Sequence, residues 1–208
     1  MDKKVIVVAI TGASGSIYGL RLADELLKKG GDVNLIISPN GFLVIKHETG
    51  LNLGKNRKDA ITTLNRYFKR SESRLKYHPY DNLLSPLASG SSSKKDMIIC
   101  PCSMGTLARI ACGVSGNLIE RTADVVLKEK GNLILVPRET PLNQIHLENM
   151  LKLCKMGAHI IPAMPGFYHK PCSVDDMINF VVGKILDAMG IENNLYKRWG
   201  KVSSRGNS

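Results

Sequence analysis

Long hydrophobic runs are missing from this sequence of 208 residues, and no apolar stretch approaches the ~20 residues that a membrane-spanning helix needs. The apolar stretch after Lys4 is too short for the core of a signal peptide and leads directly into a glycine-rich turn. Aromatic residues make up only 5% of the chain, so aromatic and basic residues do not alternate as in many nucleic-acid-binding proteins. We therefore expect a cytoplasmic protein that binds neither membranes nor nucleic acid.

Cysteines are few and odd in number, which argues against a disulfide framework in a chain without an export signal. They are Cys100, Cys102, Cys112, Cys154 and Cys172. Cys100 and Cys102 end an apolar run, but no second cysteine pair follows at the spacing of a zinc site. We expect buried, reduced thiols at these two positions and no metal site.

Negative charge is scarce, because 29 lysines and arginines stand against 18 aspartates and glutamates, for a formal net charge of +11. Residues 55–76 hold eight basic and two acidic residues and account for +6 of this excess. Four more basic residues follow Tyr196 in a polar C-terminal tail. Since no nucleic-acid-binding motif accompanies this charge, a phosphorylated small molecule is the more economical partner.

Apolar strand-like runs alternate with helical patterns along the chain. The predicted strands are 5–10, 33–37, 97–100, 133–136 and 159–161. The predicted helices are 19–29, 118–128, 145–156 and 174–189, the last with Ser173 as its N-cap. This alternation predicts an α/β fold with a doubly wound, mostly parallel sheet, a Rossmann- or flavodoxin-like three-layer sandwich. We expect one domain over residues 1–193, an inserted helix with its connections at 55–80, and a tail over 194–208.

The segment "TGASGSIYG" follows the first predicted strand and begins a helix, an arrangement that suits an anionic ligand. Its glycines, at 12, 15 and 19, are spaced differently from the G-x-G-x-x-G of dinucleotide enzymes. The second strand ends in Ser38-Pro39-Asn40, with no acidic residue for a ribose hydroxyl. The pattern therefore favours a mononucleotide such as FMN over NAD(P), with a merely tight turn as the alternative.

Further polar groups stand at the ends of later strands. Ser103, Gly105 and Thr106 form a second turn between a strand and a helix, and Arg138 with Glu139 ends the next strand. Arg121 and Lys128 are seven residues apart and so lie on one helix face. Tyr168 lies in a proline-bracketed loop after the last strand and is a candidate ligand contact. A charged pair at the end of a buried strand is a candidate site, with a structural ion pair as the alternative.

Read together, these segments resemble the flavin prenyltransferase (UbiX) family, whose members were long labelled aromatic acid or polyprenyl-hydroxybenzoate decarboxylases. The shared motifs, in chain order over residues 3–199, are "TGASGSIYG", "HETG", "ASGS", "CPCSMGTLARIACG", "NLIERTADVVLKE", "LVPRETP", "IHLENMLKL" and "PGFYHKP". The resemblance implies a reaction in which the dimethylallyl group of dimethylallyl phosphate is joined to N5 and C6 of reduced FMN. It also implies a homo-oligomer, in particular a dodecamer, whose product serves UbiD-type decarboxylases.

The resemblance also implies roles for individual residues. It assigns FMN to Gly12, Ala13, Ser14, Ser38, Ser103, Met104, Gly105, Thr106 and Arg138. It assigns the prenyl phosphate to Tyr168 and Lys184, and the chemistry to Ser14, Glu48, Arg121, Lys128 and Glu139. The chemistry is consistent, because the leaving phosphate needs neutralising cations and Glu139 or the phosphate can accept the proton released at C6. With such fixed cations we expect no metal ion to be needed.

Two positions depart from the family's pattern. Lys184 keeps the positive charge of an arginine found in relatives but not its two-pronged geometry, and Leu83 stands where some members carry an aromatic residue. Two other functions stay open. One is a flavin-dependent decarboxylase of the cysteine-decarboxylase type, which relies on an early histidine; His47 is the only candidate, in a context that indicates a helix. The other is a non-catalytic flavin carrier.

Overall fold

The computed structural model of the chain describes residues 5–54, 56–69, 74–91 and 94–200. The chain forms two compact units, Met1–Ala163 and Met164–Ser208, and each is described by itself. The first unit contains a parallel sheet of six strands in the order β3-β2-β1-β4-β5-β6. The strands are β1 (Val5–Ile10), β2 (Val33–Ile37), β3 (Leu75–His78), β4 (Lys95–Cys102), β5 (Asn132–Pro137) and β6 (His159–Ile160).

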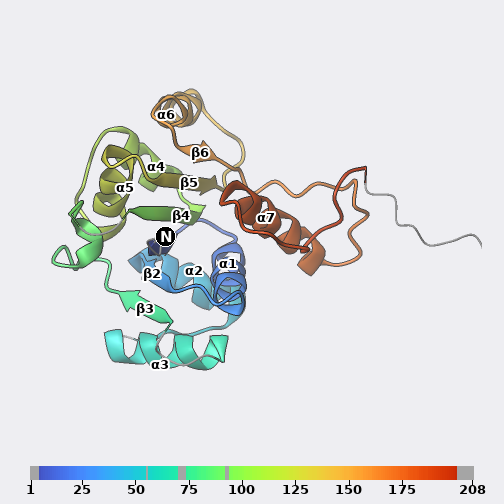
Figure 1. The fold of residues 1–208 in the computed structure, drawn as a ribbon, viewed down its shortest axis with the longest axis horizontal. Coiled ribbons are helices and arrows are strands. Elements are labelled where there is room, and N and C mark those ends of the chain that lie inside the picture. The colour runs from blue at the N-terminus through green and yellow to red at the C-terminus, as the bar shows by residue number, and fades with distance from the viewer. Residues whose placement is uncertain (1–4, 55, 70–73, 92–93, 201–208) are drawn as a thin grey trace, which may run out of the picture. The chain divides into compact units, whose positions relative to one another are not determined.

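Helices connect these strands and cover both faces of the sheet. Those of the first unit are α1 (Ser16–Lys28), α2 (Pro39–Thr49), α3 (Arg57–Phe68), α4 (Met104–Ala111), α5 (Leu118–Lys128) and α6 (Gln144–Lys155), with a short 3₁₀ turn η1 (Pro86–Ala88). The chain moves from β1 to β2 in one direction across the sheet and from β4 to β5 in the other. Because parallel crossovers are right-handed, α1 and α5 lie on opposite faces (Figure 1).

The central strands are buried on both faces, which explains their continuous apolar sequences. One core cluster lies between the sheet and the helices α4 and α5. It includes Val7, Ala9, Met97, Ile99, Leu133 and Leu135 from the strands, with Leu107, Ile119 and Ala123 from the helices. The alternate strand positions follow the two-residue period of a strand, so each face supplies its own core.

The second unit is built on α7 (Val174–Ala188) and the chain on either side of it. Ser173 caps the helix by accepting a hydrogen bond from the Asp176 amide, and Asp176 accepts in return from the Ser173 amide. This reciprocal capping box confirms the N-cap predicted from the sequence. Among the described helices, none combines the length and apolar composition needed to cross a membrane.

The α/β class and the doubly wound sheet are confirmed, and β1, β2 and α5 have the predicted bounds. The segment 55–80 was predicted as a helix with connections, but it also contributes the edge strand β3. β4 runs from Lys95 to Cys102, two residues beyond each end of the predicted strand 97–100. The single domain over 1–193 stays a prediction, and residues 201–208 of the predicted tail lie outside the described residues.

Candidate active site

Four turns rich in hydroxyl or cationic groups follow four neighbouring strands, β2, β1, β4 and β5. Since the strands are parallel, these turns line one edge of the sheet, which we call the carboxyl edge. It carries Ser38 after β2, Gly12–Ser14 after β1, Ser103–Thr106 after β4, and Arg138 with Glu139 after β5. The crossovers diverge on either side of β1, and ligands of open α/β sheets bind at such a point.

Two glycines of the first turn are each required by a different feature of the structure. Gly15 is the N-cap of α1 and has a positive φ of 93°, which favours glycine. Gly19 lies inside α1, where a Cβ atom would overlap the carbonyl oxygen of Cys100 and press on Ile10. The unusual spacing therefore reflects a left-handed cap and the close packing of α1 on the sheet.

Glu48, near the C-terminal end of α2, directs its carboxylate at the N-terminus of α1. The amides of Gly15 and Ser16 donate hydrogen bonds to it at 2.9–3.1 Å, and the Ser16 hydroxyl donates at 2.7 Å. Burial by itself would raise the pKa of Glu48, but hydrogen bonds from Ser14, Ser16 and the two amides lower it overall. The anion at this helix end is thus the chain's own carboxylate, adjacent to Ser14.

Serine hydroxyls organise the turns after β2 and β4. Ser38 accepts a hydrogen bond from the Gly41 amide at 3.0 Å and caps α2. Ser103 accepts from the Thr106 amide at 3.3 Å, donates to the Thr106 hydroxyl at 3.0 Å, and caps α4. Both turns therefore hold their hydroxyls and first helical amides in fixed positions at the carboxyl edge.

Arg138 and Glu139 end β5 at the same edge. The Arg138 guanidinium donates from Nε to the carbonyl oxygen of Ser14 at 3.2 Å, which joins the turns after β5 and β1. Glu139 is exposed, and one of its carboxylate oxygens accepts from the Thr140 amide at 3.2 Å. The structure therefore brings together Ser14, Glu48 and Arg138, with Glu139 directly following in the chain.

The two cations of α5, Arg121 and Lys128, lie at different heights along the helix, and Lys128 is far from the carboxyl edge. Lys128 ends α5, and the chain enters β5 four residues later, at the amino edge of the sheet. With ~3.3 Å per strand residue, β5 separates this edge from Arg138 by about 20 Å. Arg121 donates to the carbonyl oxygen of Ala88 at 3.1 Å and to Asp124 at 2.7 Å. Within one chain, the structure does not bring Lys128 to the carboxyl edge.

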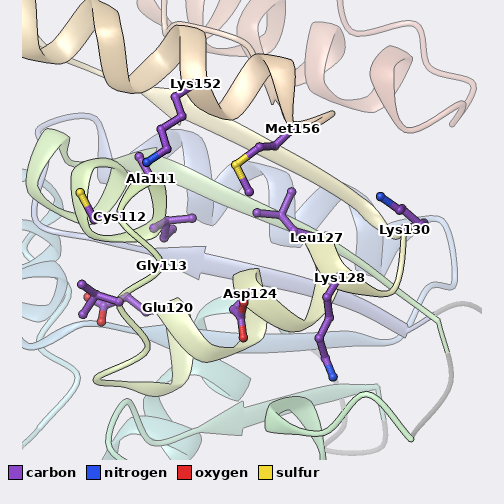
Figure 2. Close-up of a pocket in the computed structure, with 12 residues that line it drawn as sticks. Ala111, Cys112, Gly113, Glu120, Asp124, Leu127, Lys128, Lys130, Lys152 and Met156 are labelled. Carbon is purple, nitrogen blue, oxygen red and sulfur yellow. The ribbon is translucent and has the colours of Figure 1, made fainter.

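A cavity of about 520 Å³ lies between α4, α5 and α6, close to Lys128. Figure 2 shows its apolar wall with Leu127 and Met156, while the Lys128 amine points away from both. Of the residues predicted for the site, Lys128 alone lines this cavity. The cavity is therefore separate from the carboxyl edge.

The chemistry of the carboxyl edge fits an FMN-like molecule. Fixed hydroxyls, helix N-termini and one guanidinium are donors suited to a phosphate and to the polar edge of an isoalloxazine ring. In the described part of the chain, no cluster of histidine, cysteine, aspartate or glutamate has the arrangement of a metal site. Cys100 and Cys102 are buried as predicted, and burial raises the pKa of Cys102 to about 12, so its thiol stays protonated.

Comparison with known proteins agrees with this assignment. Residues 1–186 match the Flavoprotein family. The flavin prenyltransferase UbiX of Halalkalibacterium halodurans is 55% identical over 199 residues, which cover 96% of this chain and 95% of that protein. The chain belongs to the UbiX family of flavin prenyltransferases.

Two solved structures of UbiX-type proteins have the same fold. AnUbiX (PadA1), in complex with FMN and dimethylallyl pyrophosphate, is 37% identical with a TM-score of 0.82, covering 95% of this chain and 97% of its own. A dodecameric FMN-dependent UbiX-like decarboxylase from Escherichia coli O157:H7 is also 37% identical, with a TM-score of 0.80 and coverage of 93% and 98%. The E. coli protein is called a decarboxylase, the older label of this family.

The remaining predicted residues of this UbiX family member, Tyr168 and Lys184, belong to the second unit. The Tyr168 ring makes edge contacts with Phe180 and with Trp199, at centroid distances of 5.7 and 5.2 Å. The Lys184 amine lies 6.0 Å from the centre of the Tyr196 ring. Their roles in substrate binding stay predictions.

Sequence reasoning overlooked two residues of interest. Ser16, which donates to Glu48, resembled an ordinary first residue of a helix. Trp199 was overlooked because it lies in a polar tail. As the only tryptophan of the chain, it could have been singled out as a candidate packing residue. His47, the residue on which the cysteine-decarboxylase alternative depends, lies on α2 as its context indicated, and is exposed.

Proposed function

We propose that this chain joins the dimethylallyl group of dimethylallyl phosphate to N5 and C6 of reduced FMN. The observation that carries the proposal is the carboxyl edge, where Arg138 is held against Ser14 beside the capped turns at Ser38 and Ser103. The likeness to AnUbiX, whose structure contains FMN and dimethylallyl pyrophosphate, supports it.

In this proposal the turns at Gly12–Ser14, Ser38 and Ser103–Thr106 hold the flavin together with Arg138, as the resemblance implied. Reduced FMN supplies the nucleophilic N5 and C6 positions. The cations Arg121, Lys128, Arg138 and Lys184 neutralise the leaving phosphate, and the Tyr168 hydroxyl donates a hydrogen bond to it. Glu139 accepts the proton that ring closure releases.

We further propose that neighbouring copies complete the site. Lys128 lies at the amino edge of its own sheet, so it can neutralise a phosphate beside Arg138 only if it comes from another copy. Arg121 lies on the same helix face as Lys128 and would come from the same neighbour. The dodecameric UbiX-like protein of E. coli supports such an assembly, with a dodecamer as the expected form here.

The test is a single-turnover reaction. The protein is incubated anaerobically with reduced FMN and either dimethylallyl phosphate or its pyrophosphate, and the bound flavin is analysed by mass spectrometry. We expect a flavin heavier by one dimethylallyl group, formed equally well in the presence of a metal chelator. An unmodified flavin under these conditions would contradict the proposal and leave the flavin carrier as the better interpretation.

The product would serve a UbiD-type decarboxylase, as the resemblance implies. A bound flavin that stays unmodified while a cysteinyl substrate loses carbon dioxide would favour the decarboxylase alternative. The cytoplasmic location stays a prediction of the sequence.

A further inference from the structure

One carboxylate of the second unit, Asp187 in the last turn of α7, receives hydrogen bonds from three residues that follow the helix. The Arg198 guanidinium donates to both of its oxygens, at 2.7 and 3.1 Å. The Tyr196 hydroxyl donates at 2.6 Å, and the side-chain amide of Asn193 donates at 2.9 Å. We call residues 193–199 the C-terminal clasp, because these bonds fasten them back onto α7.

The surface of α7 is shaped to receive the clasp. Gly183 lies inside the helix, where a Cβ atom would approach Tyr196 to 2.5 Å and the Asn193 side-chain oxygen to 3.0 Å. The Asn193 amide also donates to the carbonyl oxygen of Gly183 at 3.3 Å. Glycine destabilises a helix interior relative to alanine, and here its bare backbone leaves the space in which the clasp packs.

The clasp contacts both residues of this unit that are assigned to the prenyl donor. The Trp199 ring meets Tyr168 edge to face at 5.2 Å, and Tyr168 in turn contacts Phe180 on α7. The Tyr196 ring lies 6.0 Å from the Lys184 amine and 5.5 Å from the Arg198 guanidinium. The orientation of Tyr168 and Lys184 therefore depends on where the clasp lies, and the clasp depends on Asp187.

We propose that Asp187 is a positioning residue for the prenyl donor: by holding the clasp on α7, it sets the orientations of Tyr168 and Lys184. The proposal rests on the proposed function for the identity of the donor, but not for the existence of the clasp. In this proposal Asp187 acts through the clasp and not by contact with the donor. Its carboxylate is the common acceptor for Arg198, Tyr196 and Asn193, so losing its charge weakens all three anchors together.

The first measurement concerns the clasp alone and needs no substrate. Trp199 is the only tryptophan of the chain, so tryptophan fluorescence reports on the clasp without interference. We expect Asp187→Asn and Arg198→Ala to lower the fluorescence anisotropy of Trp199, because the exposed ring gains freedom to move once the clasp is released. Lys197→Ala is the matched control, since it removes an exposed positive charge next to Arg198 and should leave the anisotropy unchanged.

The second measurement concerns the donor. Asp187→Asn and Arg198→Ala should raise the KM for dimethylallyl phosphate about tenfold, the size expected for losing a charge-assisted hydrogen bond. The rate at saturating donor and the affinity for FMN should change much less. Arg198→Lys should recover part of the loss, because lysine keeps the charge but not the two-pronged bond.

Gly183→Ala displaces the clasp from the helix side. It should raise the KM in the same way although alanine is the better helix former, which separates displacement of the clasp from loss of helix stability. Trp199 signals that stay unchanged in Asp187→Asn would overturn the clasp. A mobile Trp199 with an unchanged KM would overturn the positioning role. A wild-type protein that forms no adduct counts against the proposed function, whereas the fluorescence comparison decides on the clasp by itself.

Discussion

Glu48 lies on α2 but caps the N-terminus of a different helix, α1. Its carboxylate accepts hydrogen bonds from the amides of Gly15 and Ser16 and from the hydroxyl of Ser16, so it lies beside Ser14. The sequence resemblance assigned Glu48 to the chemistry, but no spacing rule could predict that its carboxylate meets the N-terminus of α1. The two residues it bonds are 32 and 33 positions away, and their meeting depends on how α2 packs beside α1.

Replacing Glu48 with glutamine should destabilise the protein by about 1 kcal/mol at neutral pH, as for the loss of a helix cap. The pKa of Glu48 lies below its ordinary value, so this stabilisation is present above the pKa of an unfolded glutamate. It is lost as the pH falls through the lowered pKa of the folded carboxylate, which then becomes protonated. Thermal unfolding of both proteins should therefore show a difference that shrinks in acid, and a difference independent of pH would contradict this.

Glu139 is the residue whose chemical role can be tested most directly. Glu139→Gln should keep FMN bound, because the flavin contacts assigned to the carboxyl edge do not involve its charge. Loss of a general base should slow adduct formation by about 100-fold or more. Single-turnover kinetics with FMN-loaded protein measure this, and reduced FMN binding with a normal rate per bound flavin would refute the role.

At the scale of elements, the strands of highest apolar content were predictable and the polar edge strand was not. β1 and β2 are short apolar runs buried between helices, and their bounds agree with the prediction. β3 has only four residues, alternates buried with exposed positions, and lies in the most basic part of the chain. Its pairing with β2 supplies the preference for a strand, and a pairing partner is not visible in a local pattern.

The capped helix α4 allows a prediction at this scale. Ser103→Ala removes the N-cap, which should cost about 1 kcal/mol of stability and also weaken FMN binding severalfold, because the turn loses its fixed hydroxyl. Ser173→Ala removes an N-cap from α7 and is the matched control. It should lower the melting temperature similarly while FMN affinity, measured by fluorescence titration, stays the same. Equal effects of both variants on FMN would remove Ser103 from the site.

For the whole molecule, strand and helix alternation was enough to predict the doubly wound sheet, because connection handedness leaves few topologies. The sequence also placed Arg121 and Lys128 correctly on one helix face. It could not show that Lys128 and Arg138 lie at opposite edges of the sheet. A seven-residue spacing tells which residues share a helix face, but not which edge of the sheet each residue is near. That separation comes from the crossover that carries α5 down to the start of β5.

If neighbouring copies complete the site, two inactive variants should rescue each other. Lys128→Ala and Arg138→Ala, co-expressed in equal amounts, should regain about a quarter of wild-type activity, because each site draws its two residues from different chains at random. The control is a mixture of Arg138→Ala and Glu139→Gln. Both residues follow β5 in the same chain, so every site in that mixture would lack one of them. Equal activity of the two mixtures, measured by prenylated flavin formed, would show that the sites are not shared.

The Glu48 carboxylate, which caps the N-terminus of α1, has a consequence for cofactor choice. In dinucleotide enzymes this helix end is left open for the pyrophosphate. Here a resident negative charge holds the same amides, so a pyrophosphate arriving there must displace it against like-charge repulsion. We therefore expect the chain to discriminate against NAD(P) and FAD, because its own carboxylate occupies the position that their pyrophosphate would take and no acidic residue directly follows β2 to bind a ribose hydroxyl.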